Sequence, residues 1–232
     1  MEKSIFLNRP NIVVSITDSK ELEEICNTKE SLSFDIVEIR LDQLIGEQSI
    51  GNKLSKINHP LLLTCRHPDE GGQNRISDPI ERQSILEPLL SYASAIDIEL
   101  AEADSMNEII SKAKNDNIKV ILSYHNFKTT PSTLESKAKE AINRGADIAK
   151  LATTTNTITE LINLFTLLEK FSDQNIAVMG MGKHGKASRL IAAKSGSILN
   201  YVAVGSAKID GQWKLNEFSK AIKESSTELT DI

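Results

Sequence analysis

Eight short runs of β-branched and apolar residues recur along the 232-residue chain at nearly regular intervals, and this rhythm is the strongest constraint on the fold. Runs of this length and composition predict β-strands. The predicted strands are residues 11–16, 35–41, 60–65, 95–100, 118–124, 147–152, 175–180 and 199–205. Stretches with the apolar spacing of an amphipathic helix separate most of them, and one more follows the last strand. The predicted helices are residues 18–28, 79–94, 105–116, 131–145, 157–171, 184–196 and 215–226.

Strands that alternate with helices predict a parallel sheet whose strands are joined by helical crossovers. Eight such units in a chain of this length predict a (β/α)8 TIM barrel. A doubly wound α/β sheet is the alternative, but it usually contains fewer strands. Because no composition shift or long linker interrupts the rhythm, we expect a single domain over residues 1–232. The polar C-terminal tail, at about 225–232, is expected to fray.

The composition argues against several classes of function. Hydrophobic residues make up 40% and charged residues 25% of the chain, which is typical of a soluble globular protein. The net charge of -5 and a pI near 5.5 argue against nucleic acid or a membrane surface as a partner. No apolar run is long enough for a signal peptide or a membrane span, so we expect a cytoplasmic protein.

The sequence predicts neither a metal nor a cofactor. Its two cysteines form no C-x-x-C pair, and its four histidines lack the spacing of a metal-binding motif. Gly180, Gly182 and Gly185 do form a G-x-G-x-x-G pattern between a strand and a helix. A dinucleotide site also needs an acidic residue about 20 positions further on, whereas the next acid here is Asp210. We interpret the glycines as a tight turn that lets the backbone and Arg189 approach an anionic group.

Lys150 is unusual because it lies between Ala149 and Leu151 in the otherwise apolar strand at 147–152. A buried ammonium group is costly unless neighbouring groups compensate it. One interpretation is structural, with the aliphatic stem packed on the barrel and the charged head reaching water. The other is chemical: an amine kept neutral by burial and by nearby cations, such as Arg66 and Arg189, attacks a carbonyl carbon.

Barrel enzymes place their chemistry at the C-terminal ends of the strands, and polar residues gather there in this sequence. They come from seven of the eight predicted strands or the loops that follow: Glu38, Arg40, Arg66, Glu99, His125, Lys150, Arg189 and Gln212. A single ionisable residue at a strand end has little meaning, but this many at one barrel mouth predict a binding site. We interpret Glu99 as structural.

His125 lies one predicted strand before Lys150, which favours a general acid/base over a structural histidine because imidazole titrates near neutral pH. Glu38 and Arg40 are two residues apart on one strand and therefore point to the same side of the sheet. They form either an ion pair that fills the barrel or a polar wall for substrate hydroxyl groups, and the two interpretations are compatible.

Seven segments in this order resemble the type I 3-dehydroquinate dehydratases, and the likeness covers nearly the whole chain. The segments are EIRLD, TCRHPDEGG, DIEL, SYHNF, IAKLA, MGMGKHGKASR and DGQ. The resemblance implies a (β/α)8 barrel of the class I aldolase type. It also implies conversion of 3-dehydroquinate to 3-dehydroshikimate and water through a lysine Schiff base. This hydro-lyase reaction is the third step of the shikimate pathway, which leads to chorismate and the aromatic amino acids.

The same resemblance implies a role for each matching residue. Lys150 would form the Schiff base, His125 would be the general acid/base, and Glu70 would orient His125. The remaining matches would hold the substrate, with Glu38, Arg40 and Arg66 at the ring hydroxyls and Arg189 and Gln212 at the carboxylate. Family members are often dimers, so a homodimer is expected. The only other partner expected is the small-molecule substrate, and no metal or cofactor is implied.

The sequence departs from the family pattern in the segment KIDGQ. The family usually has a serine four residues before the glutamine, in a loop that closes over the substrate. Here Lys208 occupies that position and no proline precedes the glycine. Ser206 is the candidate substitute if the loop is rearranged.

Two other functions stay open at this stage. One is a different Schiff-base barrel lyase, such as an aldolase or a transaldolase-like enzyme, which would bind a phosphate after the seventh and eighth strands. The other is a catalytically dead barrel that only binds a sugar acid or a protein partner.

Overall fold

The computed structural model describes residues 5, 10–27, 33–73, 75–205 and 207–225, so the predicted tail beyond residue 225 lies outside the described residues. Its strands are β1 (Asn11–Ile16), β2 (Ile36–Arg40), β3 (Leu61–Thr64), β4 (Ala95–Glu99), β5 (Lys119–Asn126), β6 (Ile148–Thr154), β7 (Ile176–Met181), β8 (Leu199–Ala203) and β9 (Trp213–Lys214). All eight predicted strands are confirmed to within two residues at each end.

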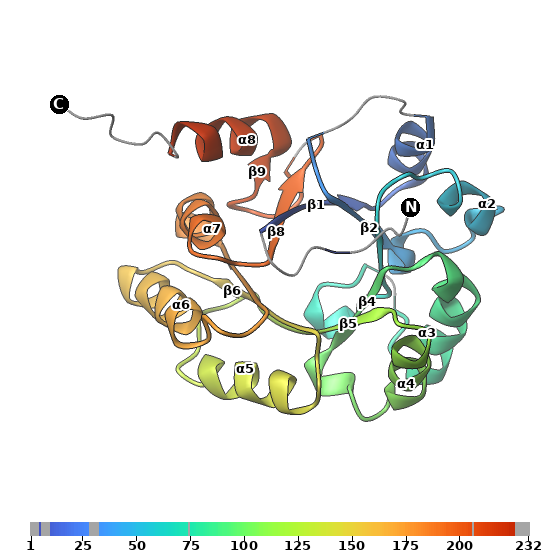
Figure 1. Cartoon of the computed structure of the whole chain (residues 1–232), viewed down its shortest axis with the longest axis horizontal. Coiled ribbons are helices and arrows are strands. Elements are labelled where there is room, and N and C mark those ends of the chain that lie inside the picture. The colour runs from blue at the N-terminus through green and yellow to red at the C-terminus, as the bar shows by residue number, and fades with distance from the viewer. Residues whose placement is uncertain (1–4, 6–9, 28–32, 74, 206, 226–232) are drawn as a thin grey trace.

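The α-helices lie around the outside of the strands, as Figure 1 shows. They are α1 (Ser19–Asn27), α2 (Ile50–Leu54), α3 (Pro79–Leu86), α4 (Asn107–Asn115), α5 (Leu134–Asn143), α6 (Ile158–Lys170), α7 (Gly185–Lys194) and α8 (Leu215–Glu224). Short 3-10 helices follow several strands: η1 (Leu41–Gln43), η2 (Pro68–Glu70), η3 (Glu87–Tyr92), η4 (Leu100–Glu102) and η5 (Gly182–His184). Within the described ranges, none of these helices is long and apolar enough to cross a membrane.

Some helix bounds have a clear local cause. Thr157 and Glu160 form a reciprocal capping box that starts α6. Asp78 caps α3, and Pro79 occupies its first turn, where a missing N–H costs nothing. The single helix predicted over 79–94 is wrong, because α3 ends at Leu86 and the tighter η3 follows. Pro88 accounts for the change, since it cannot donate the hydrogen bond that would continue an α-helix.

The strands form one curled parallel sheet, in the order β7-β6-β5-β4-β3-β2-β1-β8-β9. The barrel closes between β7 and β8, where the backbone N–H of Ile198 donates to the carbonyl of Ile176, at 3.0 Å. Nearby, the N–H of Val178 donates to the Ser197 hydroxyl, also at 3.0 Å. The cyclic order of the first eight strands confirms the (β/α)8 barrel.

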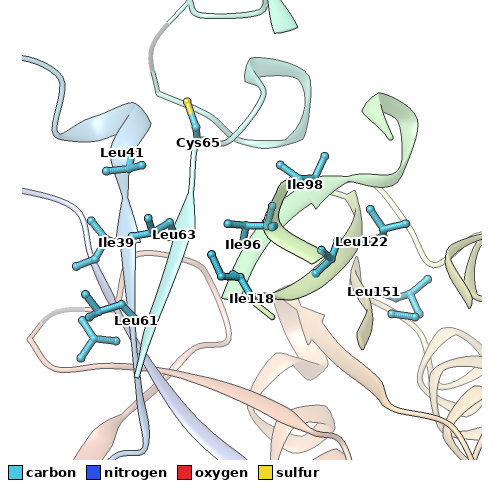
Figure 2. Packing of buried hydrophobic residues seen from close by; sticks show 14 of the residues in the cluster. Ile39, Leu41, Leu61, Leu63, Cys65, Ile96, Ile98, Ile118, Leu122 and Leu151 are labelled. Carbon is cyan, nitrogen blue, oxygen red and sulfur yellow. The ribbon is translucent and has the colours of Figure 1, made fainter. Parts of the chain in front are cut away.

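Two apolar clusters follow from the two-residue period of the strands. The outer cluster packs between the strands and the helices, and Figure 2 shows part of it, with Ile39, Leu63, Ile96 and Ile98 on neighbouring strands. The inner cluster fills the N-terminal half of the barrel. It includes one side chain from each of the eight barrel strands: Val13, Ile36, Leu62, Ala95, Ile121, Ile148, Ala177 and Leu199.

The next inward-facing residue along each strand is polar in most cases, and these residues form the floor of the barrel mouth. They are Ser15, Glu38, Thr64, Asp97, Ser123, Lys150 and Tyr201. The barrel is therefore apolar near the N-terminal ends of its strands and charged toward their C-terminal ends. This layering places the polar groups at the end where barrel enzymes bind their ligands.

Candidate active site

A cavity of about 400 Å³ opens among the C-terminal ends of the strands. Its volume suits a small molecule. Its walls include the predicted site residues that lie in the described part of the chain: Glu38, Arg40, Arg66, Glu70, His125, Lys150, Arg189 and Gln212. Ser206 lies outside the described residues. The prediction that these residues gather at one barrel mouth is confirmed, whereas the role of each one stays a prediction.

Lys150 is buried on β6, with only 3% of its surface exposed. Its Nζ atom donates to Asp97 Oδ2 at 2.8 Å and to the Tyr201 hydroxyl at 3.0 Å, and it lies 3.9 Å from Glu38 Oε1. Carboxylates are therefore the charged groups in direct contact with the amine, and the expected cation Arg66 is its neighbour only through Asp97, whose Oδ2 atom both contact. The predicted place of Lys150 near a strand end is corrected: β6 runs on to Thr154, so Lys150 lies inside the strand.

Asp97 and Tyr201 both contact Lys150, and neither was among the predicted site residues. The Oδ2 atom of Asp97 lies 3.0 Å from an Arg66 guanidinium nitrogen, and its Oδ1 accepts a hydrogen bond from Ser123 at 2.6 Å. Burial alone would raise the pKa of Asp97, but Arg66 and Lys150 outweigh it and hold that pKa far below its ordinary value. A signal was present: Asp97 lies two residues before Glu99 on a strand, so both face the barrel interior.

Arg66 lies at the centre of a buried charge network. One guanidinium nitrogen contacts Glu99 Oε1 at 2.8 Å, and Arg82 of α3 pairs with the other oxygen of Glu99. Arg82 also donates to the carbonyl of Cys65 at 2.8 and 3.0 Å. These contacts make Glu99 a support for Arg66, which agrees with its structural interpretation.

His125 and Glu70 form a close pair at the cavity wall. Glu70 Oε2 accepts from the backbone N–H of His125 at 2.9 Å and lies 2.8 Å from its Nδ1 atom. Burial, followed by the charges of Arg66 and Lys150, lowers the pKa of His125 well below its ordinary value. Burial raises the pKa of Glu70 to about 7. With Nδ1 committed to Glu70, Nε2 is the ring nitrogen left to accept a proton.

A glycine pair brings Glu70 to His125. Gly71 has a φ of 90°, which side chains other than glycine rarely adopt. At Gly72, a β-carbon would lie 2.3 Å from the carbonyl oxygen of Arg66. The chain can therefore fold back beside β3 only with glycine at this position, and this tight turn holds η2 against the strand ends.

Glu38 and Arg40 do not pair with each other as one interpretation proposed. Arg40 instead pairs with Asp42 through two hydrogen bonds of 2.9 Å. Glu38 accepts from Thr64 at 3.0 Å and from the Tyr201 hydroxyl at 3.2 Å. The difference arises because the chain turns into η1 after Arg40, which brings Asp42 back to the guanidinium.

Arg189 is a buried cation without a carboxylate partner in the described part of the chain. Its Nε atom donates to the carbonyl of Gly180 and its Nη1 atom to the carbonyl of Tyr201, both at 3.0 Å. Burial lowers the pKa of Arg189 to about 10, since only neutral carbonyls surround it. A guanidinium in such surroundings is suited to bind an anion that enters the cavity.

Gln212 reaches the cavity through a strand that the sequence analysis missed. The two-residue β9 pairs with β8, matching Trp213 to Val202. Gln212 immediately precedes β9, and its side-chain Oε1 accepts from the backbone N–H of Lys208 at 3.1 Å. The amide nitrogen is therefore left to donate to a ligand.

Comparison with known proteins agrees with this geometry. The family model for type I 3-dehydroquinase matches residues 12–228 of the chain. The chain belongs to the type I 3-dehydroquinase family. Among curated members, the 3-dehydroquinate dehydratase of Methanococcoides burtonii is 34% identical over 225 residues, covering 93% of this chain and 94% of that protein. That of Methanothrix thermoacetophila is 32% identical over 217 residues, covering 94% and 92%.

Solved structures of 3-dehydroquinate dehydratases share the fold. The type I enzyme from Clostridium difficile, described with covalently modified comenic acid, has a TM-score of 0.84 at 27% identity and covers 94% of this chain and 92% of that chain. The enzyme from Aquifex aeolicus has a TM-score of 0.81 at 27% identity, covering 94% and 100%. The (β/α)8 barrel is thus the fold of this 3-dehydroquinase.

The G-x-G-x-x-G segment of this 3-dehydroquinase serves close packing. Gly182 has a φ of 73° and makes the turn into η5. At Gly180, a β-carbon would lie 2.3 Å from the Ser188 hydroxyl, and at Gly185 it would lie 2.6 Å from the α-carbon of Gly211. The glycines therefore let α7 approach β7 and the loop before β9, which brings Arg189 to the cavity.

Lys208, at the position where the 3-dehydroquinase family usually has serine, contacts α1. Its Nζ atom lies 2.6 Å from both carboxylate oxygens of Glu21 and also bonds to the Thr17 hydroxyl. Lys208 also lines the cavity. In this 3-dehydroquinase the loop is thus held by an ion pair, while its backbone fixes Gln212. Within the described ranges, no group of three or more acidic, histidine or cysteine side chains is arranged to hold a metal ion.

Proposed function

We propose that this chain dehydrates 3-dehydroquinate to 3-dehydroshikimate and water through a Schiff base on Lys150. The observation that carries the proposal is the arrangement of three groups around one cavity. A buried amine lies on β6, a histidine paired with a carboxylate lies on β5, and α7 carries a buried guanidinium that has no carboxylate partner among the described residues. Membership of the 3-dehydroquinase family supports the substrate.

The first step condenses Lys150 with the C3 ketone. The Lys150 ammonium first releases one proton, and the neutral amine attacks the carbonyl carbon. That proton and a second one from the nitrogen end on the ketone oxygen, which leaves as water and gives an iminium ion. The C–N bond formed carries a positive charge that can accept electrons from the adjacent carbon. Asp97, 2.8 Å from Nζ, stays ionised and supplies the negative charge that stabilises the iminium.

His125 carries the proton in the next steps. Its neutral Nε2 removes the C2 proton, and the electron pair of that C–H bond moves into the iminium to give an enamine. The enamine then expels the C1 hydroxyl, which takes the proton back from His125 and leaves as water. Hydrolysis of the remaining imine releases the enone product and returns Lys150. Glu70 holds the imidazole in the required orientation through Nδ1.

The remaining cavity residues hold the substrate. Arg189 and Gln212 bind the carboxylate. Among the described residues, Arg189 is a buried cation without an acidic partner, and the amide nitrogen of Gln212 is left to donate. Glu38, Arg40 and Arg66 face the ring hydroxyl groups. This assignment places the reaction in the third step of the shikimate pathway, toward chorismate and the aromatic amino acids.

A turnover assay tests the function directly, because the conjugated enone product absorbs ultraviolet light and the substrate does not. Sodium borohydride added with ligand tests the mechanism by reducing the imine to a stable amine. Peptide mass mapping should place the adduct within residues 147–154. An adduct on Lys183, Lys186 or Lys208 would contradict the assignment of Lys150.

The same experiment separates the alternatives. A barrel that only binds its ligand would gain no covalent mass with borohydride. A different Schiff-base lyase would gain mass with its own ketone substrate but would not produce the enone from 3-dehydroquinate. We further propose that the chain acts in the cytoplasm as a homodimer, and sedimentation of the purified protein measures its oligomeric state.

A further inference from the structure

Tyr201 is the neighbour of Lys150 whose function the reaction above leaves unassigned. Its ring lies on β8 and its hydroxyl reaches the centre of the barrel, with 8% of the residue exposed. The hydroxyl accepts from Lys150 Nζ at 3.0 Å and donates to Glu38 Oε1 at 3.2 Å. The ring centroid lies 4.3 Å from the same Nζ atom. The hydroxyl thus bridges the amine of β6 and the carboxylate of β2.

The phenol keeps its proton in this position. Burial, followed by the charges of Glu38 and Asp97, raises the pKa of Tyr201 well above its ordinary value. A protonated phenol has one O–H bond to donate and lone pairs to accept. Because the O–H group donates to Glu38, a lone pair of the phenol oxygen is left to accept the hydrogen bond from Lys150. Tyr201 therefore acts on the amine as a hydrogen-bond acceptor of fixed direction.

Two fixed acceptors determine where the lone pair of the amine points. The Lys150 ammonium must release one proton before it can attack, and the neutral amine that results has two N–H bonds and one lone pair at roughly tetrahedral directions. Asp97, which does not line the cavity, accepts a hydrogen bond from one N–H. Tyr201, which does line it, accepts from the other. With both N–H bonds held by Asp97 and Tyr201, the direction left for the lone pair is the one toward the cavity, which Lys150 itself lines.

We propose that Tyr201 is a positioning residue that aims the Lys150 lone pair at the substrate ketone. This inference rests on the proposed Schiff-base function and deepens it. Tyr201 and Asp97 together hold Nζ in the attacking orientation before the ketone arrives, and the bond to Glu38 fixes the phenol. The arrangement speeds formation of the C–N bond without contributing to substrate affinity, since the phenol acts on the enzyme amine.

Tyr201→Phe tests the proposal because it removes only the hydroxyl and keeps the ring beside Nζ. The protein is mixed with saturating 3-dehydroquinate, quenched with borohydride at increasing times and weighed intact. We expect the rate of adduct formation and kcat to fall by about three- to tenfold, the range for losing one hydrogen bond to an uncharged amine. The KM for 3-dehydroquinate should stay within about twofold of the wild-type value.

Tyr124→Phe is the matched control. Tyr124 lies on the same barrel but faces the outer cluster, and its hydroxyl accepts only from the Asn126 side chain, at 3.1 Å. It should keep the wild-type rate of adduct formation. Melting temperatures measured alongside check that both variants are folded at the assay temperature, so that any loss of rate arises in the site and not from unfolding.

The outcomes separate this inference from the function on which it rests. If the wild type forms no adduct with 3-dehydroquinate, the proposed function itself is wrong. If the wild type forms the adduct and Tyr201→Phe forms it at the same rate, only the role of Tyr201 is overturned. A variant whose KM rises while kcat is unchanged would make Tyr201 a substrate-binding residue instead.

Discussion

The Nζ atom of Lys150 lies 2.8 Å from Oδ2 of Asp97, a carboxylate two strands away in the sheet and 53 residues earlier in the chain. The same oxygen lies 3.0 Å from Arg66, so one carboxylate compensates two buried cations. The amine of Lys150 is therefore tolerated in the barrel interior because β4 supplies a negative charge beside it. The free-energy cost of burying Lys150 in an apolar strand is thus offset by Asp97, which lies on a different strand.

Asp97→Asn should destabilise the protein, because it leaves Lys150 and Arg66 buried without that charge. Breaking a buried pair typically costs about 3–5 kcal/mol of unfolding free energy, and chemical denaturation measures it. Asp104→Asn is the control, since Asp104 pairs with Arg144 at the exposed surface and should change stability little. Equal effects of the two substitutions would show that the Asp97 contact is not what keeps Lys150 buried.

His125→Ala should separate imine formation from proton transfer. The variant keeps Lys150 and should still form a borohydride-trapped adduct, but its turnover should fall by about 10²–10⁴-fold, the usual contribution of general acid/base catalysis. Lys150→Ala should lose both turnover and trapping. Intact mass and the ultraviolet assay measure the two properties. Near-normal turnover in His125→Ala would move the base to Glu38 or Glu70.

Glu70→Gln should change how stability depends on pH. The folded-state pKa of Glu70 is about 7, above its ordinary value of 4.5, so between these pH values the folded protein holds a proton that the unfolded chain has released. This group therefore makes the free energy of unfolding fall as pH rises from 4.5 to 7. The stability of Glu70→Gln minus that of the wild type should increase over this window, by up to about 1.4 kcal/mol per pH unit.

Urea denaturation at pH 5, 6 and 7 measures that difference. Only its change with pH is informative, because Gln also alters the hydrogen bonds to His125 by a constant amount. A difference that does not change with pH would show that Glu70 does not hold its proton in this window.

Arg189→Ala should mainly raise KM for 3-dehydroquinate. The substrate carboxylate would lose a charge-assisted pair worth roughly 1.5–3 kcal/mol, which corresponds to about one to two decades in KM. Lys183→Ala, which removes a cation of η5 outside the cavity lining, is the control. An unchanged KM in Arg189→Ala would place the carboxylate elsewhere, with Arg66 as the next candidate.

Lys208→Ala and Glu21→Ala should act on the same contact. Each removes one side of the ion pair that holds the loop whose backbone fixes Gln212, so each should raise KM a few-fold. The pair is partly exposed, with 35% and 26% of the two side chains accessible, so the effect should stay small. The double variant should be no worse than the more affected single variant. Independent, multiplying effects would indicate that Lys208 contacts the substrate directly.

The chain order of strands and helices could be read from the sequence because it depends on local patterns. Runs of β-branched residues and the helical spacing between them set all eight barrel strands. The side chains that face the barrel interior could be predicted as well, because alternate residues of a strand point to the same side. Lys150 and His125 were thus recognisable as residues of one barrel mouth before any contact was known.

Elements stabilised by distant contacts could not be read in this way. The two residues of β9 form a strand only because β8 offers its edge, and this pairing brings Gln212 to the cavity. The helix α2 is five residues long, too short for its apolar spacing to stand out. The turn into η1, which gives Arg40 its partner Asp42, depends equally on where the strand ends.

Local sequence patterns were enough to predict the barrel and the residue types at its mouth, whereas the contacts among those residues depend on how the strands assemble. The reason is that a charged side chain is compensated by whatever lies within a few ångströms of it, and in a closed barrel those neighbours come from other strands. The sequence left open whether cations surround the amine, and the sheet register gave Lys150 its direct partners Asp97 and Tyr201. The packing of α7 left Arg189 donating to backbone carbonyls, with its charge available to a ligand.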